Sequence, residues 1–199
     1  MAGAAAALTL VAAIAIWQIP KTPETLQRAT ELPDPMPLPD FQLQDQDGLP
    51  FTRDSLVGRQ TLVFFGFTHC PDICPATLQQ LALARTELGD RLPEGSSLPD
   101  ILLISVDPYR DTADSLKAYT GYFGPGAYGA TGEPENLAAL TSALGIFHET
   151  GDTSQADYDV SHSASVLFVN SRAELQAIFG APHDVESFAH DLLILMDRT

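Results

Sequence analysis

The sequence predicts a three-layer α/β domain with one central sheet, preceded by a single transmembrane helix near the N-terminus. Two short and nearly continuous apolar runs, 61–67 and 101–106, are typical of central strands that helices cover on both faces. Between these runs Leu78, Leu81 and Leu88 recur at helical spacing, which predicts a β-α-β unit. The chain has 199 residues, of which 45% are hydrophobic, and this suits one domain with a short appendage.

The N-terminal segment 2–19 contains no charged residue and predicts a membrane anchor. At about 1.5 Å per residue a helix of this length covers roughly 27 Å, close to the hydrocarbon thickness of a bilayer. A cleaved signal peptide is the alternative, because alanine-rich sequence offers cleavage sites. The proline-rich stretch 20–37 is expected to be a stiff linker, so that the globular domain is expected to span 38–199.

The charges around the anchor do not by themselves indicate a periplasmic domain. No Lys or Arg precedes the segment, whereas Lys21 and Arg28 follow it, so the positive-inside rule alone places the domain in the cytoplasm. An amphipathic, Arg-rich mitochondrial presequence is absent from these residues, which favours a bacterial envelope.

The first part of the domain begins with a hairpin and contains two further helices. Apolar and polar residues alternate over 41–51 around Asp47 and Gly48, a pair typical of a hairpin turn. Helices are expected over 111–123, which opens with acidic residues, and over 133–144, which has a proline near its start.

The C-terminal part predicts a second hairpin and a closing helix. The segments 165–169 and 174–179 flank the turn residues Asn170 and Ser171. One apolar helix face is then formed by Val185, Phe188, Ala189, Leu192 and Met196.

The acidic composition excludes one class of partner. The formal net charge is -16 and the isoelectric point is near 4.3. Like charges repel at the encounter stage, so a long contact with nucleic-acid phosphates is unfavourable and no nucleic-acid partner is expected.

Cys70 and Cys74 are the only cysteines in the sequence, and both fall where the first core strand leads into its helix. Pro75 suits the first helical position, so Cys74 is expected at or beside the N-cap, where the helix dipole favours a thiolate. The spacing allows either a disulfide or a shared metal ion. A structural disulfide would stabilise the fold only weakly, because it closes so short a loop.

A third metal ligand has to come from elsewhere in the chain, and His162 is the best candidate. It precedes the second hairpin in a polar loop that can reach the sheet edge bearing the cysteines. The other histidines, His69, His148, His183 and His190, are expected to be surface or structural residues.

This donor set indicates which metal would fit. Two thiolates and one imidazole suit Cu(I), whereas structural zinc normally takes four ligands, and calcium or magnesium prefers oxygen. The spacing alone leaves thiol redox chemistry equally open.

Four motifs carry a resemblance to a known family: GFTHCPDICP at 66–75, SVDPYRDT at 105–112, ATGEPENLAAL at 130–140 and YDVSHS at 158–163. Together they resemble the Sco/SenC family of copper chaperones, from about Leu38 to the C-terminus. The resemblance implies a thioredoxin-like domain with a central mixed sheet, usually tethered by one N-terminal membrane helix. It also implies a role in cytochrome c oxidase assembly.

Residue by residue, the resemblance assigns the copper ligands to Cys70, Cys74 and His162. Asp107 matches an acidic position of the family at the end of the second core strand. Because Asp107 and Pro108 end a strand and Asp111 is expected to cap a helix, a supporting or partner-docking role is expected for Asp107. Two departures from the family pattern are Tyr109, in place of a common acid, and Ser161, in place of the Asp that commonly precedes the histidine.

The sequence therefore predicts a metallochaperone with no turnover of its own. The resemblance implies that it binds one copper ion, as Cu(I) and also as Cu(II), and delivers it to the dinuclear copper site of cytochrome c oxidase subunit II or to another copper-accepting protein, or that it reduces the cysteines of that site. Because the family's domains usually face the bacterial periplasm or the mitochondrial intermembrane space, the resemblance also implies a single-pass protein of the bacterial inner membrane with its C-terminal domain in the periplasm.

Two enzyme-like functions are the alternatives. In a thiol:disulfide oxidoreductase, Cys70 and Cys74 would form the redox-active pair, but that chemistry has no need of the distant His162. A peroxiredoxin-like peroxidase would need a pocket around a single reactive thiolate, and the paired, proline-flanked cysteines argue against it.

Overall fold

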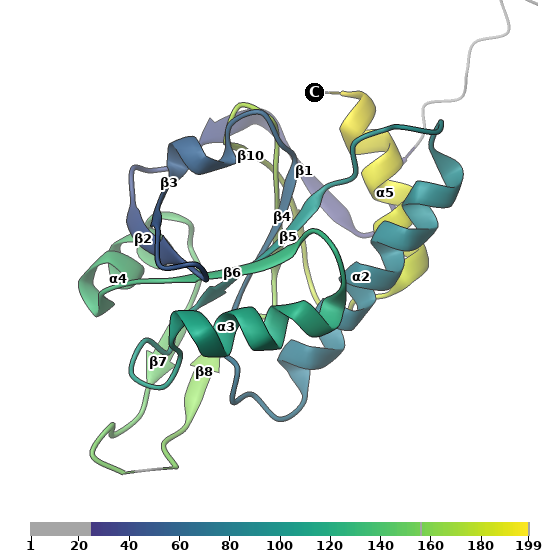
Figure 1. Cartoon of the computed structure of the whole chain (residues 1–199). Coiled ribbons are helices and arrows are strands. Elements are labelled where there is room, and N and C mark those ends of the chain that lie inside the picture. Colours follow the sequence, from purple (N-terminus) through teal and green to yellow (C-terminus); the bar gives the residue numbers. More distant parts are fainter. Residues whose placement is uncertain (1–24, 156, 199) are drawn as a thin grey trace, which may run out of the picture.

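The computed structural model describes residues 25–155 and 157–198 (Figure 1). Within these ranges no helix is both long enough and apolar enough to cross a membrane. The anchor predicted at 2–19 and the first part of the predicted linker lie outside the described residues.

A mixed, eight-stranded sheet forms the centre of the domain (Figure 1). In spatial order its strands are β1 (Ala29–Pro37), β10 (Glu174–Phe179), β9 (Val166–Val169), β4 (Thr61–Gly66), β5 (Asp100–Ser105), β6 (Ala127–Thr131), β2 (Gln42–Asp45) and β3 (Pro50–Thr52). The β4–β5 and β5–β6 pairs are parallel, whereas β9 pairs with β4 in the antiparallel direction. The predicted central strands and both predicted hairpins are confirmed.

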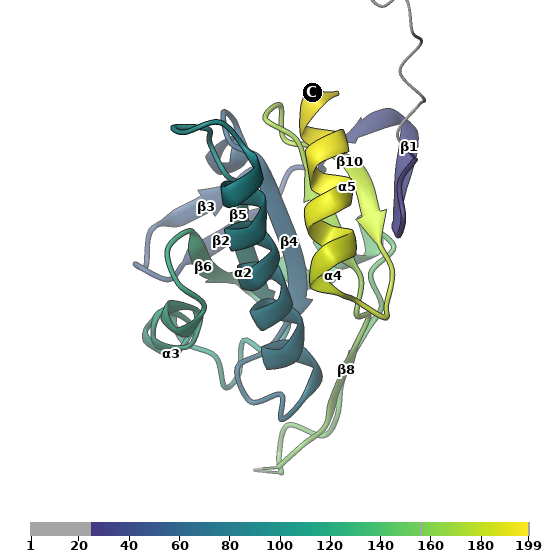
Figure 2. The same cartoon turned by 90° about the vertical axis from the view of Figure 1, so that its right-hand side faces the viewer.

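Helices cover both faces of this sheet and complete the predicted three layers. One face packs against α2 (Ile73–Arg91), α3 (Ala113–Thr120) and α5 (Val185–Asp197), with Leu78, Leu116 and Phe188 in a shared core. Figure 2 shows α2 and α5 side by side on that face. The other face packs against α4 (Pro134–Ala143) through Leu137, and Phe51 of β3, from the same sheet, lies in the same core. The described residues also form two short 3-10 helices, η1 (Arg53–Leu56) and η2 (Gly121–Phe123).

Strand β6 was not predicted from the sequence. Its five residues, AYGAT, form no apolar run, and they read as part of a loop between two helices. This segment forms a strand because it pairs with β5, in which Ile101 to Ile104 lie parallel to Ala127 to Ala130. The helix predicted over 111–123 is shorter than expected, since Thr112 caps α3 through the N–H of Ser115.

The linker predicted over 20–37 is wrong for its last nine residues, which form the edge strand β1. The register along β10 breaks between Glu31 and Met36, and Pro33 and Pro35 fall within this break, where no ladder donor is required. The folded domain therefore begins well before Leu38.

A buried carboxylate holds the residues just before this strand. Asp191 in α5 is fully buried and accepts hydrogen bonds from the backbone N–H groups of Gln27, Arg28 and Ala29, at 2.7 to 2.8 Å. These contacts fix the start of β1 against the closing helix.

A second, two-stranded sheet joins β7 (His148–Thr150) to β8 (Val160–His162). The residues around His162 were expected to be a polar loop, but His162 ends a strand and lies opposite His148. Figure 1 shows this hairpin projecting beyond the edge of the main sheet.

Candidate metal centre

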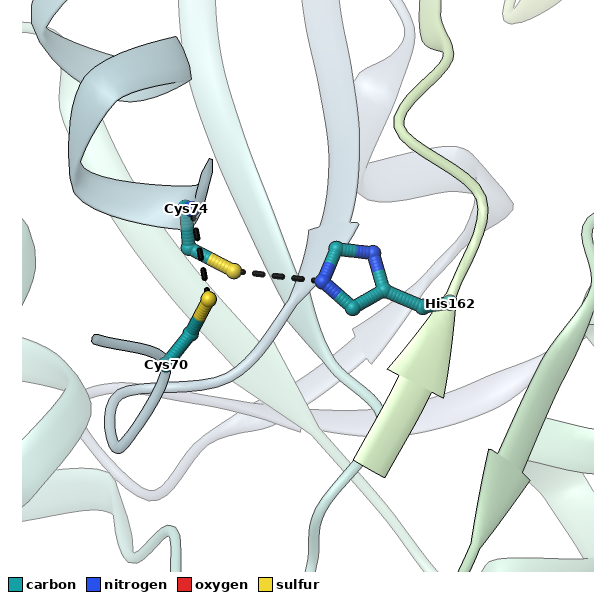
Figure 3. Close-up of side chains that lie close together, drawn as sticks. All are labelled: Cys70, Cys74 and His162. Atoms are coloured by element: carbon teal, nitrogen blue, oxygen red, sulfur yellow. Dashed lines mark hydrogen bonds between the residues drawn. The ribbon is translucent and has the colours of Figure 1, made fainter. Parts of the chain in front are cut away.

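The two cysteines lie between the end of β4 and the first turn of α2 (Figure 3). The helix begins at Ile73 with Asp72 as its N-cap, so Cys74 is the second helical residue and Pro75 the third. The prediction that Pro75 is the first helical residue is therefore wrong by two positions. Proline is tolerated there because the first N–H groups of a helix have no partner within the helix.

Cys74 is fully buried, and its burial outweighs the helix N-terminus, which was predicted to favour the thiolate. Burial raises the pKa of the Cys74 thiol well above its usual range, and the neighbouring Cys70 and Asp111 add to the rise. The expectation that the helix dipole favours a thiolate is wrong for the metal-free protein. Gly66 is required beside this thiol, since a Cβ there would lie 2.9 Å from Cys74 Sγ.

The imidazole of His162 points its Nε2 atom at Cys74 (Figure 3). Nε2 lies 3.3 Å from Cys74 Sγ, and Nδ1 lies 2.9 Å from the carbonyl oxygen of Ser163. Because a carbonyl can only accept, Nδ1 carries the proton and Nε2 presents its lone pair to the thiol. Burial lowers the pKa of His162, which keeps the ring neutral at physiological pH.

Two phenylalanines fix the plane of that ring. The ring centroids of Phe64 and Phe67 lie 5.6 Å and 5.8 Å from that of His162, in nearly perpendicular arrangements. Both come from β4 and the residue that follows it, so the same segment leads to the cysteines and orients the histidine. In the sequence these two residues stand out only as part of an apolar run.

Cys70 completes a cluster of three potential ligands. The Sγ atoms of Cys70 and Cys74 and one ring nitrogen of His162 all lie within 4.8 Å of one another. Both cysteines are free thiols, and the backbone N–H of Cys74 donates to Cys70 Sγ at 3.4 Å. Two sulfurs and one neutral imidazole nitrogen therefore form one compact donor set, and this set fits a soft ion such as Cu(I).

The other four histidines lie outside this cluster. His69 contacts Thr68 and Asp111, His183 bonds the carbonyl of Ala164, and His190 bonds Asp191. His148 lies opposite His162 across the ladder, but the three-residue group does not include it.

Buried acids support the cysteine loop and do not join the cluster. Asp111 accepts hydrogen bonds from the backbone and hydroxyl of Thr68 and from the hydroxyl of Ser105. It therefore anchors the loop before Cys70, and the expectation that Asp111 caps a helix is wrong, because Thr112 is the cap. Asp107 is also fully buried and bonds Arg110 and Tyr158.

A cleft of about 400 Å³ opens beside the cluster. Its lining includes His69 and Cys70 from the segment that joins β4 to α2, Ile73 from the start of α2, and Ser161 and His162 from β8. Since Cys70 is half-buried and Cys74 fully buried, an incoming group reaches Cys70 first.

Comparison with known proteins identifies similar chains. The SCO1/SenC family profile matches residues 30–197. A protein of Stutzerimonas stutzeri whose name describes copper binding is 36% identical over 167 residues, which cover 84% of this chain and 80% of its own. The mitochondrial SCO1 homolog 1 of Arabidopsis thaliana is 35% identical over 148 residues, which cover 74% of this chain and 43% of the plant protein. The chain therefore spans less than half of that relative.

Solved structures show the same fold. ScoI of Arabidopsis thaliana with copper bound is 30% identical, has a TM-score of 0.74, and the match covers 81% of this chain and 98% of that one. ScoI of Bradyrhizobium japonicum with copper bound is 31% identical, has a TM-score of 0.68, and the match covers 80% and 99%. The thioredoxin-like α/β fold with a central mixed sheet is shared with these proteins.

Proposed function

The chain belongs to the SCO1/SenC family, and we propose that it is a copper chaperone that holds one copper ion between Cys70, Cys74 and His162. The convergence of these three donor atoms within 4.8 Å is the observation that carries the proposal. The two thiolates suit Cu(I), and the imidazole adds the nitrogen ligand that Cu(II) favours. The copper-bound structures of similar proteins support the same metal.

Delivery proceeds by ligand exchange at the open side of the site. Cys70 lines the cleft, so a thiolate of the acceptor approaches copper there while Cys74 and His162 still hold it. Family membership supports an acceptor in cytochrome c oxidase assembly, and we propose the dinuclear copper site of subunit II, with another copper-accepting protein as the alternative.

Reduction of the acceptor's cysteines is a second candidate function. Cys70 and Cys74 are free, and their sulfurs lie within 4.8 Å of each other. Two thiols here and one disulfide in the acceptor would exchange to give a Cys70–Cys74 disulfide and two acceptor thiols. This reaction uses the same reduced pair as copper delivery but leaves His162 without a role.

The proposed location is the bacterial inner membrane, with a single N-terminal anchor and the domain in the periplasm. The charge-free segment 2–19 supports the anchor, and family membership supports the side of the membrane.

Anaerobic copper titration tests the proposed function. The reduced 199-residue chain should bind one Cu(I), and Cys70→Ser or Cys74→Ser should abolish tight binding. His162→Ala should weaken binding, whereas the matched control His69→Ala, on the same cleft, should not. Tight stoichiometric binding by both cysteine variants would refute the ligand assignment. A disulfide-reduction assay separates the second function, because His162→Ala should leave purely redox activity intact.

A further inference from the structure

The hairpin that carries His162 is not part of the main sheet. Within the described residues, β7 and β8 form a ladder of their own, with His148 opposite His162. Figure 1 shows them projecting away from the domain, whereas the cysteines belong to the β4–α2 connection. Contacts at the base of the hairpin must therefore fix the distance between His162 and the two sulfurs.

Arg110 supplies several of these contacts. Its Nη1 donates to the carbonyl oxygen of Tyr158 at 3.2 Å, and its guanidinium carbon lies 3.8 Å from the centroid of the Tyr158 ring. The same carbon lies 5.8 Å from the centroid of the Phe67 ring. Because Phe67 packs edge-on against His162, Arg110 contacts both the chain that leads into β8 and the aromatic wall beside the imidazole.

Asp107 ties this arrangement to the main sheet. Its carboxylate is fully buried just after β5, accepts from Arg110 Nε at 2.5 Å, and also accepts from the Tyr158 hydroxyl. A buried charge is costly unless it is paired and hydrogen-bonded, so removal of either partner is expected to loosen the whole set.

We propose that Asp107, Arg110 and Tyr158 form a clamp that positions His162 and thereby determines how well the site retains Cu(II). The inference rests on the proposed copper function. Two thiolates can satisfy Cu(I), whereas Cu(II) gains more from a nitrogen ligand held in place. Loosening the clamp should therefore weaken the site for Cu(II) more than for Cu(I).

The test compares two variants. Tyr158→Phe removes only the hydroxyl, and Arg110→Lys keeps the positive charge but loses the planar guanidinium with its several N–H donors. Tyr109→Phe, on an exposed neighbouring residue, is the matched control. Each full-length chain is purified in detergent. Without copper, the NMR signals of the His162 imidazole report its position against the Phe67 ring. With copper, EPR nitrogen coupling reports imidazole ligation of Cu(II), and competition titrations give both dissociation constants.

In Tyr158→Phe we expect Cu(II) binding to weaken about tenfold and Cu(I) binding to weaken less than about threefold, because the hydroxyl supports a ligand without touching the metal. The imidazole signals should shift in both clamp variants and stay fixed in the control. Unshifted signals, or equal losses for the two oxidation states, would overturn the clamp. If one variant does not fold, the other decides. If no chain binds copper, the proposed function fails, and the imidazole signals still decide whether His162 is clamped.

Discussion

The Nε2 atom of His162 lies 3.3 Å from the Sγ atom of Cys74, although the two residues are 88 positions apart in the chain. In the metal-free protein the Cys74 thiol can donate its proton to Nε2, because Nδ1 donates to the Ser163 carbonyl and Nε2 keeps its lone pair. Copper that enters the site has to displace this proton.

Copper affinity should therefore rise with pH. Burial raises the pKa of the Cys74 thiol, so the group is protonated at neutral pH and loses a proton when copper binds. Burial lowers the pKa of His162, so protons compete with copper for the imidazole only under acidic conditions. Competition titrations between about pH 5 and 8 should show tighter Cu(I) binding at each higher pH. An affinity that does not change over this range would contradict proton competition at Cys74.

The two thiols should differ in reactivity toward an alkylating agent. Cys70 is half-buried beside the cleft, whereas Cys74 is fully buried and has a raised pKa. Iodoacetamide should modify Cys70 at least about tenfold faster, because the thiolate is the reactive form and Cys74 is both buried and protonated. Mass spectrometry of peptides at timed intervals measures the two rates, and unfolded protein is the control in which the rates should converge. Equal rates in the folded chain would show that Cys74 is not protected.

Ser161→Asp should strengthen Cu(II) retention more than Cu(I) affinity. The added carboxylate would border the cleft beside the ligand His162, and negative charge there favours the harder ion. Competition titrations in both oxidation states measure the two gains. An equal or larger gain for Cu(I) would show that this position does not tune charge.

The structure adds a control for that substitution. Ser161 lies opposite Glu149 in the β7–β8 ladder, so a new Asp faces a like charge, which costs roughly 0.2–1 kcal/mol. The double variant Ser161→Asp, Glu149→Gln should therefore be more stable to urea than Ser161→Asp alone, by about the same amount.

Asp191→Asn should destabilise the fold and release the start of β1. Burial alone would raise the pKa of Asp191, but three backbone donors outweigh it and lower the pKa. The loss at neutral pH should be on the order of 1–3 kcal/mol, because an amide places donors against buried N–H groups. Urea denaturation measures this loss, with the exposed Asp197→Asn as the control.

The pH dependence of this effect has a definite sign. A carboxyl whose pKa is lowered on folding stabilises the protein above its unfolded pKa of about 3.9, and this stabilisation is lost as pH falls through the folded value. The difference between native protein and Asp191→Asn should therefore shrink at acidic pH. A constant difference down to about pH 2 would contradict an ionised Asp191.

The full-length chain should remain with membranes after washing in high salt or carbonate. Protease added to intact spheroplasts should digest the domain if it faces the periplasm. A shortened soluble product would indicate a cleaved signal peptide, and protection from protease would support the orientation that the positive-inside rule gives. A chain that begins at residue 20 is the matched control and should not sediment with membranes.

Local patterns in the sequence were sufficient for the elements that are strongly periodic. The structure confirms the strands predicted at 61–67 and 101–106, both hairpins and the main helices. These elements could be predicted because the spacing of apolar residues reflects which faces are buried. The cysteine positions followed from the same reasoning. The pairing of His162 with them came from elimination and from the family motifs, and the structure brings the three together.

Features that depend on neighbours distant in the chain could not be predicted from local pattern. Strand β6 exists because β5 lies beside it, and β1 forms despite its prolines because β10 offers an edge. The protonation of Cys74 also depends on tertiary structure. A helix N-terminus favours a thiolate, but burial disfavours the charged form more strongly, so the pKa of the thiol is raised. The sequence alone determined which donor atoms are present, and packing determined their distances, protonation and exposure, because desolvation depends on every residue that surrounds the site.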